Sequence, residues 1–116
     1  MPHFIIEVAE PLLAEYPAKL LIEHVKQAAN KSQLFTPDDI KCRVQPFEIF
    51  DCGQEGMVFI HVVAKLLSGR TLAQRKYLSS EIVEQLQRLA VSNISITAEI
   101  VEIEKESYTK HVTLAV

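Results

Sequence analysis

The stretch PHFIIEV, Pro2–Val8, decides the fold, because it is a strand-like apolar run that begins directly after Met1. Phenylalanine, isoleucine and valine favour a buried strand, and the Glu10–Pro11 pair ends it. If Met1 is removed, the ring nitrogen of Pro2 becomes a free secondary amine at the start of this strand. An α-amino group titrates near ~7.7–8.0, and burial lowers that value toward neutrality. Pro2 is therefore a candidate general base, although proline at this position is also common for reasons of N-terminal processing alone.

Length and composition indicate a single domain over residues 1–116 with a substantial core, since nearly half of the residues are apolar. The net charge of −3, with the two signs interspersed, gives no footprint of binding to nucleic acid or to an acidic membrane. Cys42 and Cys52 match neither a disulfide framework nor a zinc pattern, so we expect two reduced, packed thiols. The sequence shows neither a leader-like segment nor an apolar run of ~20 residues, which predicts a cytoplasmic protein.

The apolar periodicity predicts a repeated order of strand, helix and strand. Pro17 suits the first turn of one helix, and Thr71 with Gln74 forms a capping box at the start of another. On the second helix, the expected buried stripe is Leu78, Ile82, Val83, Leu86, Leu89 and Ala90, and the expected exposed face is Glu81, Glu84, Gln85 and Arg88. The predicted elements are strands over 3–8, 40–50, 57–67 and 93–103, helices over 17–31 and from 71, and a short strand over 111–116 that pairs with a neighbouring subunit.

The two halves of the chain, about 1–52 and 53–116, echo one another at a nearly constant offset. Phe4-Ile5 corresponds to Phe59-Ile60, and the two predicted helices start at matching positions. This doubled β-α-β order predicts an α+β fold in which a four-stranded sheet carries two helices packed on one face. The other face of the sheet is then expected to be apolar and uncovered, which predicts an oligomer.

Few residues offer catalytic chemistry. The serines have no activating base nearby in sequence, and Gly53, Gly56 and Gly69 fit no phosphate-cradling pattern. The four histidines lack metal-ligand spacing, so no metal site is predicted, and a structural role suits each of them better. His61, on the most apolar predicted strand, is the one histidine for which a functional role stays open.

Arginine and lysine residues are more informative. Arg70 follows the glycine that ends the most apolar strand, at the mouth of the second helix, while Arg43 and Lys41 share one face of the strand over 40–50. A guanidinium presents a planar fork to carboxylate oxygens. Cations beside an apolar pocket with a free amine would suit a small anionic substrate, although each cation alone is more often a solvated surface charge. Arg75, one turn into the helix, is assigned to structure or to an ion pair between subunits.

Three segments resemble 5-carboxymethyl-2-hydroxymuconate isomerase of the tautomerase superfamily. They are residues 1–7 (MPHFIIE), residues 40–44 (IKCRV) and residues 59–75, which begin with FIH and end with GRTLAQR. The resemblance covers most of the chain in outline and is most specific at the N-terminus and at Gly69-Arg70. No motif alone is diagnostic, but the order of the motifs, the chain length and the doubled β-α-β pattern agree.

The resemblance implies an isomerase, a keto-enol tautomerase of aromatic compound catabolism, that needs no metal or organic cofactor. Pro2 would act as general base and then as acid on a small unsaturated 2-hydroxy or 2-oxo carboxylic acid. Arg70 and Arg43 would hold substrate carboxylates and stabilise oxyanion charge, with Lys41 and His3 as further substrate-binding residues. The family forms trimers with the proline pocket near subunit boundaries, so a homotrimer is expected. The C-terminal segment shows no obvious aromatic-rich wall for such a pocket.

Two other functions remain open from the sequence. The same order of elements suits a ferredoxin-like oligomeric module that binds a small ligand without catalysis, and residues added before Pro2 should not harm such a module. A protein with the tautomerase fold could also perform hydration or dehalogenation instead.

Overall fold

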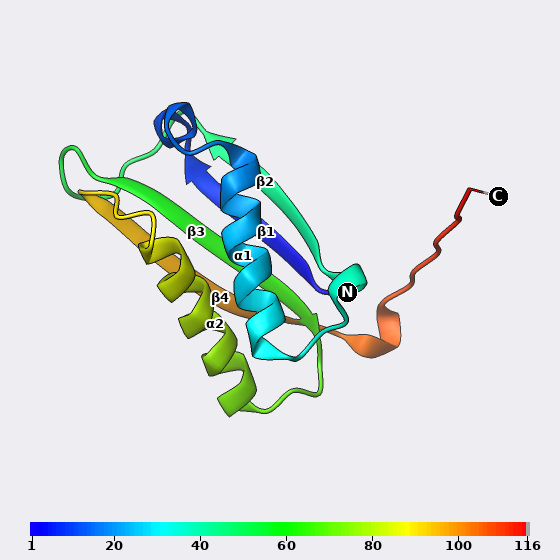
Figure 1. Cartoon of the computed structure of the whole chain (residues 1–116). Helices are drawn as coiled ribbons and strands as arrows, with labels where there is room; N and C mark the ends of the chain where they lie inside the picture. Colours follow the sequence, from blue (N-terminus) through cyan, green and yellow to red (C-terminus); the bar gives the residue numbers. More distant parts are fainter. Residues whose placement is uncertain (116) are drawn as a thin grey trace.

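The computed structural model describes residues 1–115, which form one mixed sheet with two long helices on one of its faces (Figure 1). The strands are β1 (His3–Ala9), β2 (Lys41–Phe47), β3 (Val58–Leu67) and β4 (Ile94–Ile103), and the helices are α1 (Ala18–Ser32) and α2 (Leu72–Gln87). Three short 3-10 helices complete the described chain, namely η1 (Glu10–Ala14), η2 (Pro37–Asp39) and η3 (Lys105–Ser107). The predicted order of strands and helices is confirmed, apart from the last predicted strand.

The sheet has the strand order β2-β1-β3-β4 within the described residues. β1 runs parallel to β2, and β3 runs parallel to β4, so each pair is joined by a helix in a β-α-β unit. β1 and β3 are antiparallel neighbours at the centre, which joins the two units back to back. The fold is therefore α+β, as predicted, with a duplicated β-α-β plan.

The core lies between the sheet and the two helices. Alternate residues of each central strand point toward the helices and are fully buried, because side chains on a strand alternate between its faces. Burying one such apolar side chain stabilises the fold by roughly 1.5–3 kcal/mol. The core residues include Phe4, Ile6 and Val8 of β1, Ile60, Val62, Ala64 and Leu66 of β3, Leu21 and Val25 of α1, and Leu78, Ile82 and Leu86 of α2.

The start of α2 is fixed by the predicted capping box. The Thr71 hydroxyl accepts a hydrogen bond from the Gln74 backbone N–H at 3.1 Å, and the Gln74 side-chain oxygen accepts from the Thr71 N–H at 2.8 Å. These bonds satisfy two backbone donors that the first turn of a helix leaves free. The turn between β3 and α2 is therefore held in place, and this turn carries Arg70.

The predicted exposed face of α2 is wrong at two positions. Glu81 and Gln85 are buried, because α2 packs against α1 as well as against the sheet. Glu81 forms an ion pair with Lys31 of α1 at 3.2 Å, and the Gln85 carbonyl accepts from His24 Nδ1–H at 3.0 Å. The expected stripe also extends too far, since Ala90 is exposed.

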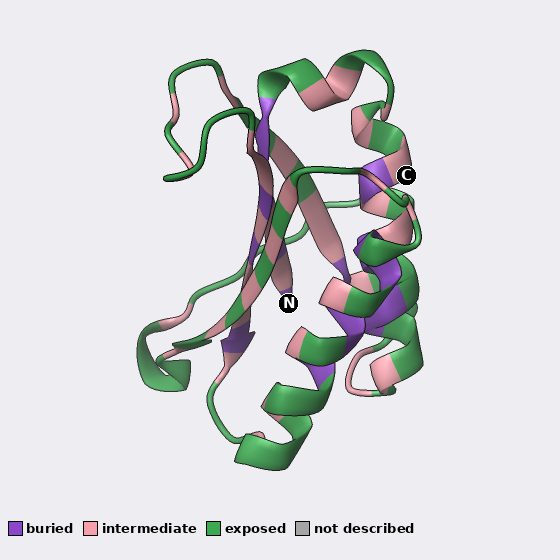
Figure 2. Cartoon of the chain, turned by 90° about the vertical axis from the view of Figure 1, so that its left-hand side faces the viewer, coloured by how far each residue is buried: buried purple, intermediate pink, exposed green. Residues whose placement is uncertain are grey.

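The face of the sheet away from the helices is uncovered in the single chain (Figure 2). The expectation that it is apolar is wrong, because charged and polar side chains lie on it beside apolar ones. The apolar side chains of the central strands alternate onto the helix side and leave a mixed surface behind. Cross-strand pairs on this open face place Ile5 between Arg43 and Val63, and Glu7 between Gln45 and His61. On this face lie the polar or charged residues His3, Glu7, Lys41, Arg43, Gln45, His61, Lys65, Ser95, Thr97 and Glu99, and the apolar residues Ile5, Phe47, Phe59, Val63, Leu67, Val101 and Ile103.

The predicted strand over 111–116 is absent from residues 111–115, and Val116 lies outside the described residues. The tail after Tyr108 extends away from the body of the molecule (Figure 1), and its Val112 and Leu114 side chains are exposed. A strand needs a partner for its backbone groups, and the single chain offers this tail none. Among residues 1–115, no helix is long and apolar enough to cross a membrane.

Candidate active site

The predicted site residues meet at the end of the sheet where β1 and β2 begin and β3 ends. His3 is the cross-strand partner of Lys41 on one side and of Lys65 on the other. Pro2 is fully buried, and its carbonyl accepts a hydrogen bond from the Lys41 backbone N–H at 3.1 Å. This bond continues the ladder between β1 and β2, so the proline is held where the sheet begins.

The environment of the chain's N-terminal amine disfavours a positive charge. In the chain that starts at Met1, this amine donates to the Asp39 carbonyl at 3.3 Å. Burial, followed by the hydrogen bond and charge of Lys41 and the charge of Lys110, lowers the pKa of the amine from 8.0 to about 6, while Asp39 opposes the shift. An amine placed here is therefore largely neutral at pH 7, the form that can accept a proton.

Lys41 is held against the same carbonyl as the N-terminal amine. Its Nζ donates to the Asp39 carbonyl oxygen at 3.1 Å, so two amino groups converge on one backbone acceptor. The η2 helix, which follows Thr36, supplies that acceptor at the entrance to β2. The structure thus brings Lys41 to the proline end of β1, as the sequence predicts.

His3 and Arg43 are joined in a chain of hydrogen bonds that ends at Tyr108. Arg43 Nη1 lies 3.3 Å from His3 Nδ1, and His3 Nε2 lies 3.0 Å from the Tyr108 hydroxyl. The two rings make an edge contact with their centroids 6.1 Å apart. Burial, followed by the charges of Arg43, the N-terminal amine, Lys41 and Lys65, lowers the pKa of His3. The imidazole is therefore neutral at pH 7.

The sequence did not point to Tyr108 as part of this site. The available signal was slight: Tyr108 is the one residue among phenylalanine, tyrosine and tryptophan between Glu104 and the end of the chain, and polar residues flank it. The structure places this ring against His3, 105 positions away in the sequence. The C-terminal segment therefore does contribute an aromatic side chain beside Pro2.

Arg70 lies at the same end of the sheet but on the helix side. Its guanidinium donates to the Leu34 carbonyl at 3.1 Å and to the Leu67 carbonyl at 3.3 Å. It also stacks 5.2 Å above the Phe35 ring, which in turn makes an edge contact with Phe4. Arg70 is separated from Arg43 and Lys41 because β1 lies between β2 and β3. The structure therefore does not bring Arg70 into contact with Lys41 or Arg43, although all three lie at the same end of the sheet.

The cations of this end are not neutralised by acidic side chains. In residues 1–115 the ion pairs join Lys31 to Glu81, His61 to Glu99, and Arg75 to Glu102. None of these pairs uses Lys41, Arg43 or Arg70, so no carboxylate among these residues neutralises the three charges. Arg75 pairs with Glu102 of the same chain, which fits a structural role, one of the two roles expected for it from the sequence. Within the same residues, no cluster of three or more histidine, cysteine, aspartate or glutamate side chains is arranged to hold a metal ion.

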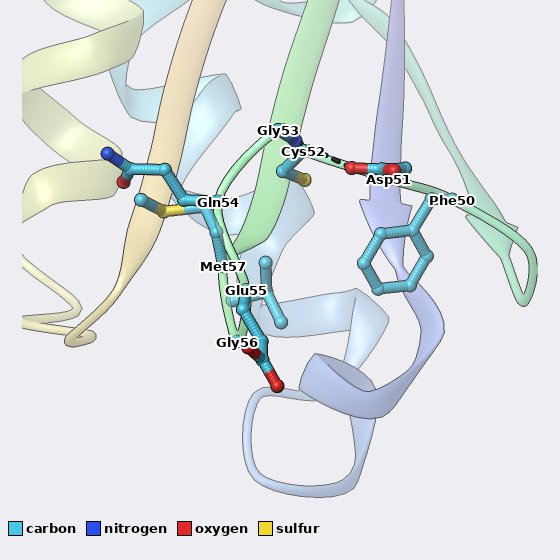
Figure 3. Close-up of a pocket in the computed structure, with 9 residues that line it drawn as sticks. Phe50, Asp51, Cys52, Gly53, Gln54, Glu55, Gly56 and Met57 are labelled. Atoms are coloured by element: carbon cyan, nitrogen blue, oxygen red, sulfur yellow. Dashed lines mark hydrogen bonds between the residues drawn. The ribbon is translucent and has the colours of Figure 1, made fainter.

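A hollow of about 590 Å³ lies at the opposite end of the sheet, along the loop that leads into β3 (Figure 3). This loop is closed by Asp51, whose carboxylate accepts from the Gly53 N–H at 2.7 Å. Gly53 and Gly56 adopt φ values of +85° and +76°, which glycine reaches without strain. Asp51 and Glu55 give the hollow negative charge, so it suits a small anion less well than the end that holds Pro2.

A buried proline at the start of the central strand of a doubled β-α-β sheet, with unpaired cations on both sides, defines a protein of the tautomerase type. Residues 2–115 match the family described as 5-carboxymethyl-2-hydroxymuconate isomerase. The chain belongs to that family and is an isomerase. No individually curated protein matches the sequence.

Solved structures share the fold at low sequence identity. A 5-carboxymethyl-2-hydroxymuconate delta-isomerase is 15% identical with a TM-score of 0.81, over 97% of this chain and 89% of that one. A 5-carboxymethyl-2-hydroxymuconate isomerase from Deinococcus radiodurans R1 is 18% identical with a TM-score of 0.79, over 97% and 90%. A fused 4-OT described as a wild type symmetric trimer is 15% identical with a TM-score of 0.78, over 97% and 94%.

Proposed function

We propose that the chain moves a proton within a small unsaturated 2-hydroxy or 2-oxo carboxylic acid, of the 5-carboxymethyl-2-hydroxymuconate kind, with Pro2 as the base and then the acid. The observation that carries this proposal is the environment of the Met1 amine, where burial and Lys41 lower the pKa to about 6. Removal of Met1 would make the Pro2 nitrogen, one residue further along, the terminal amine at this end of the sheet. An amine poised near neutrality can both take and return a proton.

The cations supply the second half of the mechanism. As Pro2 removes a proton from the dienol, negative charge spreads over the conjugated acid toward its oxygens. Arg43 and Arg70 hold the carboxylates and offset this charge from the two sides of β1, and Lys41 adds a third positive charge beside the amine. Pro2 then returns the proton to a carbon of the same conjugated system while the oxygen becomes a carbonyl, so no external acid, metal or organic cofactor takes part.

A homotrimer belongs to the same proposal. The open face of the sheet leaves Ile5, Val63 and Val101 without a covering layer in the single chain. Copies of this chain can cover one another's open faces around a three-fold axis, and one structure of the same fold is described as a symmetric trimer. Light scattering on the purified protein should therefore give three times the mass of the 13.1 kDa chain. A monomer would contradict this part of the proposal.

The test of the chemistry combines intact mass with ketonisation of 2-hydroxymuconate or phenylenolpyruvate, on protein with its native start. We expect Met1 to be absent, and Pro2→Ala to lower kcat/KM by about 10²-fold or more, the usual contribution of a general base. A variant with one alanine inserted before Pro2 is the matched control, because it keeps the ring but acylates its nitrogen, and it should lose as much activity. Full turnover in either variant would overturn the proposal.

A further inference from the structure

The Tyr108 hydroxyl lies at the end of a hydrogen-bond chain whose proton positions follow from chemistry alone. An arginine guanidinium has only donors, so His3 Nδ1 must accept from Arg43 across their 3.3 Å separation. A ring nitrogen that accepts carries no proton, and the neutral imidazole therefore holds its proton on Nε2. Nε2–H then donates to the Tyr108 oxygen, which lies 3.0 Å away.

This arrangement directs the Tyr108 proton away from His3. The phenol oxygen already accepts from the imidazole, so its own O–H has to find a different acceptor. Among the hydrogen bonds of residues 1–115, the Tyr108 hydroxyl makes none except the one with His3. The residue as a whole is half-buried. A donor that has no acceptor within the protein is free to donate to a ligand that supplies one.

The surroundings of this donor select an anion. Lys110 lies two positions further along the tail, close enough for its charge to act on the N-terminal amine. Lys41 and Arg43 approach from β2, and Lys65 from β3. A carboxylate or enolate oxygen would satisfy the Tyr108 proton and the cations together, whereas a ligand ammonium group would be repelled by the same charges.

We propose that Tyr108 is a substrate-contacting residue, which donates a hydrogen bond to an anionic oxygen of the substrate, and that His3 is a positioning residue that aims this hydroxyl. Tyr108 keeps its proton throughout, so it stabilises charge without transferring a group. His3 itself cannot bind the substrate through its ring nitrogens, because Arg43 and Tyr108 use both of them. This inference rests on the proposed function, since it concerns the same site and the same acid.

The first experiment compares Tyr108→Phe with Tyr16→Phe in the ketonisation of 2-hydroxymuconate. Tyr16 lies at the opposite end of the sheet, so it controls for the loss of a hydroxyl alone. We expect Tyr108→Phe to lower kcat/KM by roughly 10- to 100-fold, mainly through kcat, as for the loss of an oxyanion donor. The Tyr16 variant should match the wild type. Equal rates in the two variants would overturn the inference and leave the role of Pro2 intact.

The positioning role of His3 is tested by rescue. His3→Leu breaks both hydrogen bonds and should lose about as much kcat/KM as Tyr108→Phe, and the double variant should lose no more than either single one. His3→Gln can accept from Arg43 through its oxygen and donate to Tyr108 through its nitrogen, so it should recover most of the lost rate. Equal loss in the Gln and Leu variants would overturn the positioning role.

A binding measurement separates this inference from the proposed function. Adipate is a dicarboxylate with no double bond to shift, and calorimetry measures its affinity without any turnover. Tyr108→Phe should weaken adipate binding about tenfold relative to the wild type and to Tyr16→Phe. If the wild type turns over no enol but shows this difference, the proposed function fails and the Tyr108 contact stands. No adipate binding by the wild type, or equal binding by all three proteins, would overturn the contact.

Discussion

The two ends of the sheet share one backbone plan and carry opposite chemistry. Because β1 and β3 are antiparallel neighbours, β1 begins where β3 ends, and β3 begins where β1 ends. Each end of the sheet therefore holds the start of one β-α-β unit. At the end that holds Pro2, which we call the basic end, Lys41 and Lys65 pair with His3 on its two sides, and Arg43 lies two pairs further along β2. At the acidic end, Glu10 follows β1 and Glu48 follows β2.

The pKa of an acid-base group is shifted at each end, in opposite directions, and a like charge contributes to both shifts. At the basic end, burial and then Lys41 lower the pKa of the N-terminal amine to about 6. At the acidic end, a hydrogen bond that protonated Glu10 donates to the Glu48 carboxylate, and then the negative charge of Glu48, raise the pKa of Glu10. Each site resists the addition of more of its own charge. The duplicated fold thus provides two equivalent corners, and the side chains alone decide which corner can bind an anion.

Arginines at the two ends of α2 give the strongest test of this comparison. Arg70 precedes the helix at the basic end, and Arg88 is its C-cap at the acidic end. Arg70→Ala should lower kcat/KM by about 10²-fold, because it removes an anion-binding guanidinium. The kcat/KM of Arg70→Lys should lie between the values of the wild type and of Arg70→Ala, since a lysine keeps the charge but not the planar fork. Kinetics of 2-hydroxymuconate ketonisation provide the measurement.

Arg88→Ala is the matched control, and it should keep the wild-type rate. Arg70 also donates to the Leu34 and Leu67 carbonyls, so each Arg70 variant needs a thermal unfolding curve beside its kinetics. A folded Arg70→Ala protein with the activity of Arg88→Ala would show that the basic end does not hold the substrate through Arg70.

A smaller effect is expected from the charge of Lys41. The Pro2 amine works as a base only when unprotonated, so kcat/KM should rise with pH through the pKa of that amine. Lys41 lowers the pKa of the Met1 amine, which is bonded to Pro2. If its charge acts on the Pro2 amine in the same way, Lys41→Met should move the acidic limb of the profile to higher pH, by roughly one unit or less. Lys76→Met, on the exposed face of α2, is the control and should leave the limb in place. An acidic limb that does not move, or that moves to lower pH, in Lys41→Met would show that the charge of Lys41 does not lower the pKa of the base.

The fold could be predicted from local signals, because specific residues mark where helices begin and the spacing of apolar residues distinguishes helices from strands. Pro17 precedes α1, the Thr71 capping box starts α2, and the period of the apolar residues separates strands from helices. The burial of Glu81 could not be predicted in this way, since it depends on the position of Lys31 across the helix pair. Periodicity reports which face is apolar, not which neighbour covers it.

The candidate site was predictable in part, for the same reason. Pro2, Lys41 and Arg43 lie on neighbouring strands, so pairing β1 with β2 brings them together. Tyr108 belongs to a segment without regular structure, and no periodicity links it to His3. The carbonyl partners of Arg70 come from the loop after α1 and from the end of β3, and a sequence pattern does not encode such backbone contacts.

The smallest effect is expected at the acidic end, from Glu48→Gln. At pH 7 the ionised Glu10 and Glu48 repel each other in the folded chain, and the substitution removes this repulsion. Because the folded-state pKa of Glu10 is raised, the unfavourable term grows as pH rises through its ordinary value of 4.5 and is absent well below it. Thermal unfolding should show a Tm higher by on the order of 1 °C at pH 7 and unchanged at pH 3.5, since exposed charges are well screened.

Glu84→Gln, on the exposed face of α2, makes the same substitution without a carboxylate partner and should change neither Tm. Turnover of 2-hydroxymuconate should remain at the wild-type level in both variants, because neither residue lies at the basic end. If Glu48→Gln instead lowered kcat/KM as far as Arg70→Ala does, the two ends would be coupled, and the charge of the acidic end would have to be counted as part of the site.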